Sequence, residues 1–376
     1  MEQLTGNHTR TTVALGVSVF AVFIVFIFQG LDFTDMGFWL TGYQDFRAHP
    51  ASMGCRASCW LTYFLCHHYG GIFGFQVLGY KTGQALVCAG AAVISYRLLS
   101  TCLGASRILA FLVFLTAMLS RTYGGNWLGY NDLTALFYLA GAYFLYIGLC
   151  RKKMVFVVMA GVLLGANFFI RLPNVVGVAF VSAVWLHAWA HQWSSRNALW
   201  WSMCFFGGIT LGTLSILLLI YFNGHIGLYS ENVRELFAGN TGSKGPDSSP
   251  KMLVMFFRDH SRALMYALPL MGMGILLSGW ISNRSRFLRN SFILAGSLGL
   301  FAVLYRWGYW KIMIPGFCFI TLAFVVVKCF RKEPESALLA FISGMMLLLV
   351  PLGSNNGISN AIFGLWLALP FALITL

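Results

Sequence analysis

Residues 12–29 of the chain read TVALGVSVFAVFIVFIFQ and contain no charged side chain. A helix needs about 20 mostly apolar residues to cross the hydrocarbon core of a bilayer, so this run is long enough to span a membrane. It is longer than the roughly 7–15 apolar residues of a secretory signal, and Gly-Leu-Asp-Phe-Thr-Asp follows it in place of a cleavage site. We therefore expect a first transmembrane helix that is retained.

Similar apolar runs recur along the whole chain, in which 59% of the residues are hydrophobic and only 10% are charged. Soluble domains carry roughly 25% charged residues, so this composition indicates an all-α polytopic transmembrane bundle. A further amphipathic run at 57–69 is expected to lie in the membrane interface as a juxtamembrane helix. We expect about twelve spans, at residues 12–29, 76–97, 107–122, 132–149, 154–170, 174–191, 198–222, 262–281, 291–305, 312–328, 337–351 and 361–376.

The formal net charge is +14, but the 25 Lys and Arg residues are scattered in twos and threes at the ends of the apolar runs. A nucleic-acid-binding protein gathers such residues on one soluble face, so we expect no nucleic-acid partner. Short cytoplasmic loops of membrane proteins are enriched in Lys and Arg, and loops such as 151–153 and 284–289 carry this excess. We expect an integral protein of a bacterial inner (plasma) membrane with a cytoplasmic N-terminus.

Two long loops are expected on the external side, at residues 30–75 and 223–260. The second contains a cluster rich in Gly, Ser and Pro at 239–250, which is typical of a flexible loop. Ordered loops of this length are uncommon unless they bind or gate a ligand. We therefore divide the chain into a transmembrane module at 1–222, an external loop at 223–260 and C-terminal transmembrane helices at 261–376.

The segment after the first span, residues 30–40, reads GLDFTDMGFWL and carries two carboxylates three positions apart, Asp32 and Asp35. Positions three apart share one face of a helix. A carboxylate beside a low-dielectric boundary can act as a general base or bind a divalent metal. The same residues also fit the cap of a short interfacial helix that is anchored by Phe38 and Trp39. The sequence leaves both interpretations open.

Two further polar residues lie at span boundaries on the external side. Asp132 opens a span after a short turn, and it is either a functional carboxylate or a helix N-cap. Arg171 lies between two spans that are separated by little more than Pro173. An Arg at membrane depth is costly and indicates function, and its planar fork suits a phosphate group. The alternative is that its side chain reaches the interface.

Two other external groups are candidates for binding. The tandem pair His67 and His68 could join the acidic pair at a metal, although His is also common at membrane interfaces. A cluster of cations and aromatic rings fits either a phosphate with a stacked sugar ring or an interfacial aromatic belt. Its members are Arg306, Trp307, Tyr309, Trp310 and Lys311.

Together these residues resemble the GT-C superfamily of integral-membrane glycosyltransferases, including its mannosyl- and arabinosyltransferase-like members. The similarity covers roughly residues 10–200. It consists of the acidic motif after the first span, the large first loop with juxtamembrane helices, the short second loop that leads into Asp132, and a Gly-rich fifth span that ends in Arg171 and Pro173. The motif here is Asp-Phe-Thr-Asp, where several branches of the family have adjacent Asp and Glu.

The resemblance implies hexosyl or pentosyl transfer from a polyprenyl-phosphate-linked sugar to a glycan, lipid or protein acceptor, in contact with membrane lipids. The resemblance allows for a divalent metal cofactor, Mg²⁺ or Mn²⁺, without requiring one. The implied roles are general base for Asp35 with Asp32 as its neighbour, acceptor or metal assistance for Asp132, His67 and His68, and lipid-phosphate binding for Arg171, Arg306 and Lys311.

Other classes of membrane protein also fit parts of this pattern. A cell-surface polysaccharide polymerase or ligase would have many spans and external arginines, here Arg234, Arg258 and Arg262, without needing the early acidic motif. A transporter or lipid-linked sugar flippase predicts mid-span charges and inverted repeats, and the predicted spans carry few such charges. A non-catalytic scaffold that recognises lipid-linked sugar remains a third alternative.

Overall fold

The computed structural model describes residues 2–28, 35–121, 127–241, 249–282, 310–352 and 357–375. Within these ranges every regular element is a helix, with fourteen α-helices and three 3₁₀ helices. Six helical segments in the described part are long and apolar enough to cross a membrane: α4 (Val77–Leu103), α6 (Tyr130–Cys150), the η2–α8 segment (Leu172–Ala190), α9 (Ser195–Phe222), most of α13 (Lys311–Cys329) and the η3–α15 segment (Gly357–Thr375). The chain is therefore an all-α, polytopic integral membrane protein.

The predicted spans coincide with helices wherever they fall on described residues. The predicted span at 291–305 lies outside the described residues. Four further predicted spans correspond to shorter apolar helices, each of 10–17 residues. They are Thr9–Val25, Arg107–Ser120, Met154–Asn167 and Pro334–Leu349. The helices themselves are thus confirmed, and the total of about twelve spans stays a prediction.

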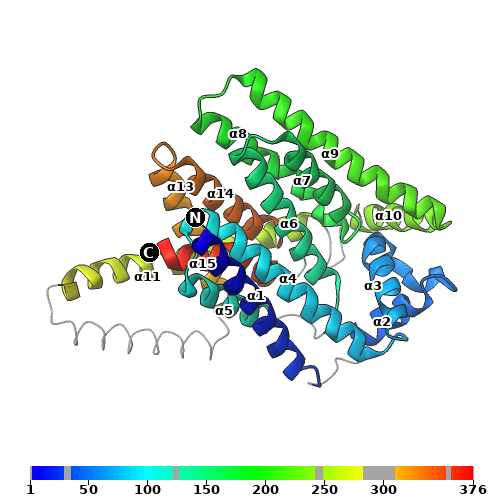
Figure 1. Ribbon diagram of the computed structural model, residues 1–376. Coiled ribbons are helices and arrows are strands. Elements are labelled where there is room, and N and C mark those ends of the chain that lie inside the picture. Colours follow the sequence, from blue (N-terminus) through cyan, green and yellow to red (C-terminus); the bar gives the residue numbers. More distant parts are fainter. Residues whose placement is uncertain are drawn as a thin grey trace.

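The centre of the molecule is formed by α4 and α6, which pack against each other (Figure 1). On one flank, α1 (Glu2–Val25) and α5 (Arg107–Arg121) pack on α4. On the other flank, α7 (Met154–Asn167) packs on α6, and α9 packs on α7 along the edge of the bundle. The last helices are α11 (Ser249–Ser282), α13 (Trp310–Cys329), α14 (Pro334–Leu349), η3 (Gly357–Gly364) and α15 (Leu365–Thr375). Of these, α14, η3 and α15 pack on the first half, whereas α11 and α13 pack on each other and on the other C-terminal helices.

The contact between α7 and α9 is made through glycine. A Cβ atom added at Gly161 or Gly165 of α7 would collide with the backbone of α9 at Phe205 or Ile209. The reciprocal collisions occur at Gly208 and Gly212 of α9. Small residues four apart let two membrane helices approach closely, because packing between backbones replaces the hydrophobic effect inside lipid.

The outer face of α9 is mainly apolar and carries no charged side chain after Arg196. Its exposed side chains include Leu199, Met203, Leu211, Leu218 and Phe222, which are more than half exposed. A large continuous apolar surface of this kind is incompatible with water and is what a lipid-facing helix requires. The α9 surface therefore supports the assignment of the chain to the membrane.

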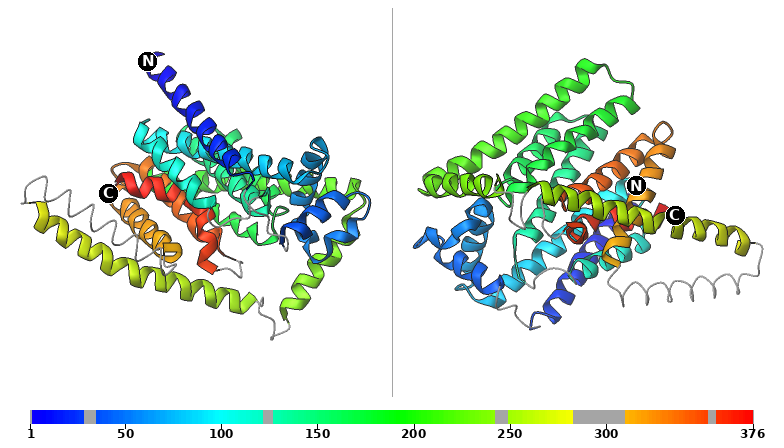
Figure 2. Two further views of the ribbon diagram at one scale, coloured as in Figure 1. Left: turned by 90° about the horizontal axis from the view of Figure 1, so that it is seen from below. Right: turned by 180° about the vertical axis from the view of Figure 1, so that it is seen from behind.

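A separate group of helices lies at one end of the bundle, and both termini lie at the other end (Figures 1 and 2). This end group consists of α2 (Asp35–Asp45), η1 (Pro50–Cys59), α3 (Trp60–Ile72) and α10 (Ile226–Thr241). It has its own apolar core, which includes Trp39, Tyr43, Phe46 and Trp60. The juxtamembrane helix predicted at 57–69 falls on the end of η1 and on α3, so a helix there is confirmed. In the second predicted loop, α10 and the start of α11 occupy much of 223–260.

Candidate functional site

Hydrogen bonds from distant parts of the chain hold the end group on the bundle. The Leu61 backbone N–H donates to the Phe169 carbonyl at 2.8 Å, and the Thr62 hydroxyl donates to the Ile170 carbonyl at 3.0 Å. These two carbonyls are available because α7 ends at Asn167 and the chain is not α-helical again until α8 (Val181–Ala190). The break after α7 therefore serves as the attachment point of the first loop.

A buried amide organises this break. The Asn174 side-chain amide donates to the Thr134 hydroxyl at 2.9 Å and to the Asn167 side-chain and backbone oxygens at 3.0 and 3.1 Å. The Tyr138 hydroxyl donates to the Asn174 carbonyl at 3.2 Å. All four residues are buried. In a low-dielectric interior hydrogen bonds of this kind are strong, and here they hold the turn that carries Arg171.

Arg171 is the first residue of a row of stacked groups that crosses from the bundle to the end group. Its guanidinium carbon lies 5.7 Å from the centre of the Tyr130 ring, at the start of α6. The Tyr130 ring lies 5.2 Å from the Trp39 ring of α2. On the far side, the Arg56 guanidinium lies 4.8 Å from Trp39 and 4.3 Å from Phe38. Two cations are therefore held on one aromatic platform by cation–π contacts.

Of the two carboxylate residues in the acidic motif, Asp35 falls in the described part of the chain. It is the first residue of α2, three and four positions before Phe38 and Trp39. Asp32 lies outside the described residues. The structure thus brings Trp39 of α2 together with Tyr130 and Arg171. That these segments form one functional site stays a prediction.

Asp132 is held by two hydrogen bonds. One carboxylate oxygen accepts the Gly129 N–H at 3.3 Å, and the other accepts the Gln84 side-chain amide at 3.4 Å. The N-cap of α6 is Gly129, and Asp132 is the third residue of the helix. The expectation that Asp132 is itself the N-cap is therefore wrong, because its carboxylate reaches back to the cap residue as in a capping box.

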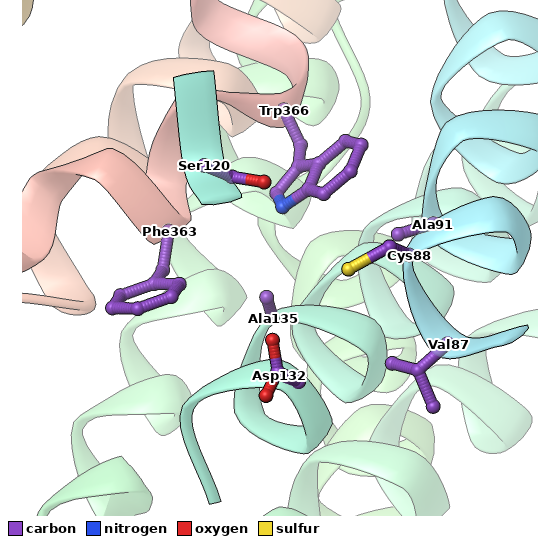
Figure 3. A pocket seen from close by; sticks show the side chains of 8 residues that line it. All are labelled: Val87, Cys88, Ala91, Ser120, Asp132, Ala135, Phe363 and Trp366. Carbon is purple, nitrogen blue, oxygen red and sulfur yellow. The ribbon is translucent and has the colours of Figure 1, made fainter. Parts of the chain in front are cut away.

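Asp132 also lines a small pocket between helices from both halves of the chain (Figure 3). The pocket has room for about one water molecule. Figure 3 shows the Cys88 thiol and the Ser120 hydroxyl turned into the same space, with Trp366 and Phe363 closing it. Because Phe363 belongs to η3 and Trp366 to α15, the C-terminal helices complete the surroundings of a residue on α6.

Two functional candidates on α4 were missed by the sequence predictions. Lys81 is buried, and its ammonium group donates to the Ile27 carbonyl at 2.8 Å, at the end of α1 and just before the acidic motif. Gln84, three residues later, holds Asp132. A Lys near the start of an otherwise apolar span was the available signal, because buried charges in spans are costly. Arg56 was also missed, and its stacking on α2 has no signature in the sequence.

The tandem histidines have separate, defined partners. The His67 Nδ1–H donates to the Tyr43 carbonyl at 2.7 Å, which leaves Nε2 as an acceptor, and burial lowers the His67 pKa. The His68 Nδ1–H donates to the Phe64 carbonyl at 2.8 Å, and its Nε2 accepts from Arg47 at 3.1 Å. Both ring nitrogens of His68 are therefore engaged, so that His68 could bind a metal only by giving up one of these bonds.

The predicted cation and aromatic cluster is only partly visible. Arg306 lies outside the described residues, and Lys311 is the second residue of α13 and is partly buried. The helix α13 packs on α11, α14, α15 and η3, so Lys311 belongs to the C-terminal helices.

The described residues do not fit a divalent metal. No group of three or more His, Cys, Asp or Glu side chains among them is arranged to hold an ion. In addition, both Asp132 oxygens already accept hydrogen bonds, and so does His68. We therefore derive no catalytic step through Mg²⁺ or Mn²⁺.

Comparison of the chain with protein-family models, with curated proteins and with solved structures gave no match in any of the three.

Proposed function

We propose that the protein is a GT-C-like integral-membrane glycosyltransferase, which moves a sugar from a polyprenyl-phosphate-linked donor to an acceptor at the external membrane face. The observation that carries this proposal is the row from Arg171 through Tyr130 to Trp39, the fifth residue of α2. This row connects Arg171, whose guanidinium suits a phosphate, to the helix that begins with Asp35. Asp132 is two residues after Tyr130 in α6.

The proposed roles follow from the needs of sugar transfer. The reaction passes through an oxocarbenium-like transition state and requires a carboxylate and stabilisation of the leaving group. Asp35, with Asp32 as its neighbour, takes the proton of the acceptor hydroxyl as that oxygen bonds to the anomeric carbon. Arg171 stabilises the charge on the carrier phosphate as it leaves, assisted by Arg306 or Lys311 from the C-terminal half. Asp132 and His67 assist the acceptor.

The placement of the end group supports a single external face. The sequence predicts that residues 30–75 and 223–260 lie on the same side of the membrane, and their described helices α2, α3 and α10 lie at the same end of the bundle. A count of about twelve spans, a cytoplasmic N-terminus and a bacterial inner membrane are part of this proposal. The acceptor would be a glycan, a lipid or a protein.

The proposal is tested by sugar transfer from radiolabelled polyprenyl-phosphate sugars in membranes that contain wild type, Asp35→Asn or Asp45→Asn at equal expression. Asp45 is the matched control, because it is the last residue of the helix that Asp35 begins. Loss of a general base typically lowers a rate by about 10²–10⁴-fold, so we expect at least a 100-fold loss with Asp35→Asn. We expect less than a twofold change with Asp45→Asn.

Equal transfer by wild type and Asp35→Asn would eliminate Asp35 as the base and favour a polysaccharide polymerase or ligase. That alternative would instead depend on the cations of α11, among which Arg258 and Arg262 are exposed. Absence of transfer by wild type from every donor tested would favour a transporter, a flippase or a scaffold.

A further inference from the structure

The helix α11 has one buried face and one exposed face in its first part. Ala263 and Ala267 are buried, and the Ala263 carbonyl lies against Gly316 of α13, so closely that a Cβ atom there would be 2.7 Å from this oxygen. The opposite face carries exposed apolar side chains one to two turns apart. They are Val254 at 65% exposure, Phe257 at 65%, Met265 at 62% and Leu268 at 55%.

This exposed stripe lies on the outside of the molecule. Figure 2 shows α11 crossing the surface of the bundle, with none of the described elements over its outer side. An exposed apolar stripe on a membrane protein faces lipid tails or another protein. The α9 surface is of this kind, and it carries no charged side chain after Arg196.

The α11 stripe differs from the α9 surface because it contains two cations near its middle. Arg258 and Arg262 are four residues apart, which places them one above the other on the helix surface. The Arg258 Nε lies 3.3 Å from a carboxylate oxygen of Asp259, but 53% of its side chain stays exposed. Asp259 supplies one negative charge against the two arginines, so this part of the helix keeps a net positive charge.

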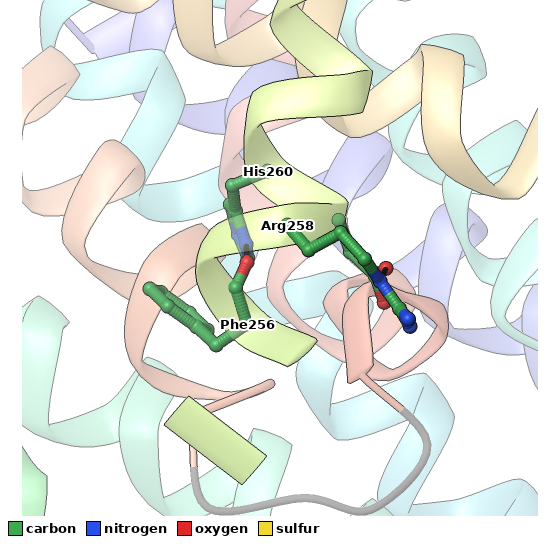
Figure 4. A network of polar contacts seen from close by, with 4 residues as sticks. Phe256, Arg258 and His260 are labelled. Carbon is green, nitrogen blue, oxygen red and sulfur yellow. Dashed lines mark hydrogen bonds and ion pairs between the residues drawn. The ribbon is translucent and has the colours of Figure 1, made fainter. Parts of the chain in front are cut away.

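The other titratable groups nearby, His260 and Asp259, lie on other sides of the helix. Figure 4 shows Arg258 on one side of α11 and the Phe256–His260 pair on another. The His260 Nδ1–H donates to the Phe256 carbonyl at 2.8 Å. Asp259 is only 17% exposed, and its carboxylate contacts the start of η3 at Gly357. The two arginines are therefore the charged groups that this stripe offers to a ligand.

We infer that this stripe of α11 is a binding site for an anionic phospholipid, with Arg258 and Arg262 on the phosphate and the flanking apolar residues on the acyl chains. The Arg fork matches phosphate geometry and is weakly hydrated, which favours it for such contacts at a membrane. A second copy of the chain fits less well. A symmetric contact between two such stripes would place arginines against arginines near its centre.

The test uses the full-length protein in nanodiscs that contain photoactivatable phosphatidylglycerol or phosphatidylcholine with a diazirine in the acyl chain. After crosslinking and pepsin digestion, mass spectrometry measures label on α11 peptides and on α9 peptides, with α9 as the internal control. We expect the phosphatidylglycerol-to-phosphatidylcholine labelling ratio to be at least fivefold higher on α11 than on α9. In the double variant Arg258→Gln and Arg262→Gln, the phosphatidylglycerol-to-phosphatidylcholine labelling ratio should be the same on α11 as on α9.

Arg258→Lys with Arg262→Lys should retain at least half of the preference, and unchanged α9 labelling shows that each variant is folded. Equal ratios on α11 and α9 in wild type, or an unchanged preference in the Gln variant, would overturn the inference. Loss of the preference on adding millimolar inorganic phosphate at constant ionic strength would also overturn it, because the site would then bind free phosphate. A dimer crosslinked through α11 in place of lipid labelling would assign the stripe to a second copy.

Discussion

The α7–α9 pair and the end group of α2, η1, α3 and α10 are held together by different kinds of contact. The α7–α9 pair meets through backbone at Gly161, Gly165, Gly208 and Gly212. The end group is joined by side chains from distant segments. The Trp60 indole N–H donates to His225 Nδ1 at 3.0 Å, and the Ser58 N–H donates to the Asn232 side chain at 2.9 Å.

Because of this difference, the two regions should respond differently to pH, to salt and to single substitutions. Backbone packing between glycines depends on volume alone, and it is insensitive to pH and salt. The end group depends on protonation states and on individual donors and acceptors, each worth about 0.5–1.5 kcal/mol. The α7–α9 contact therefore depends on close packing as a whole. The end group depends on separate hydrogen bonds, each of which a single substitution can remove.

The largest effect is expected from a single methyl group in the glycine contact. Gly208→Ala places its Cβ against the Val158 carbonyl of α7, whereas Cβ at the adjacent Gly207 meets nothing within 4 Å. Overpacking against backbone costs about 3 kcal/mol, so we expect Gly208→Ala to lower the free energy of unfolding by this amount. Gly207→Ala should be neutral or raise it by up to about 1 kcal/mol. Unfolding in mixed micelles measures both, and equal stability of the two variants would contradict the packing.

A smaller loss is expected at the break after α7. Asn174→Ala leaves the Thr134 hydroxyl and the Asn167 oxygens without their amide donor. Leaving buried polar groups unsatisfied costs about 1–3 kcal/mol, and we expect about 2 kcal/mol. The control is Asn197→Ala at the exposed start of α9, which should change stability by less than about 0.5 kcal/mol. Stability of Asn174→Ala equal to that of the control would show that the network does not hold the break.

Acid should weaken the end group through His225. Trp60 only donates, so His225 Nδ1 must be unprotonated, and burial lowers the His225 pKa. The unfolded state, with a pKa of about 6.5, then binds more protons, so the stabilisation is present above that pH and is lost as pH falls through the folded-state pKa. We expect wild type to lose about 1 kcal/mol more than His225→Gln between pH 7 and pH 5.5.

The comparison with His225→Gln is needed because other histidines contribute to the same pH range. Burial also lowers the pKa of His67 and of His260. Only the difference between wild type and the variant isolates His225. Parallel stability curves for the two proteins would refute the assigned role of the Trp60 contact.

The smallest effect is expected at the surface of the end group. Arg47→Gln removes the 3.1 Å contact to His68, and both side chains are exposed. Exposed polar contacts contribute little, so we expect a change of less than about 0.5 kcal/mol in the free energy of unfolding. A loss as large as that of Asn174→Ala would mean that the end group is held from its outside.

The helices of the bundle were predictable from the sequence because lipid requires continuous apolar runs. The break between residues 170 and 174 was also predictable, since Pro173 cannot continue a helix. The helical content of 223–260 was not predicted. Its composition suggests a loop, and α10 is held by tertiary partners of His225 and Asn232 that no local pattern reveals.

For the candidate site, charge at a span boundary was the signal that singled out Arg171 and Asp132 in the sequence. The sequence could not pair them with their neighbours. The contact of Gln84 with Asp132 joins residues 48 positions apart, and that of Lys81 with Ile27 joins residues 54 apart. Arg56 reaches α2 only because η1 bends at Gly54, which has a φ of 51°. Such contacts depend on the packed fold.

The attachment of the first loop sets an order for biosynthesis. The acceptor of the Thr62 hydroxyl, the Ile170 carbonyl, is 108 residues later in the chain. The acceptor of the Ser58 N–H, the Asn232 side chain, is 174 residues later. At a synthesis rate of roughly 5–20 residues per second, the second partner follows after about 10–35 s. During that interval the aromatic core of the loop lacks its final cover, so a nascent chain that stalls before α10 would leave it open to chaperones and proteases.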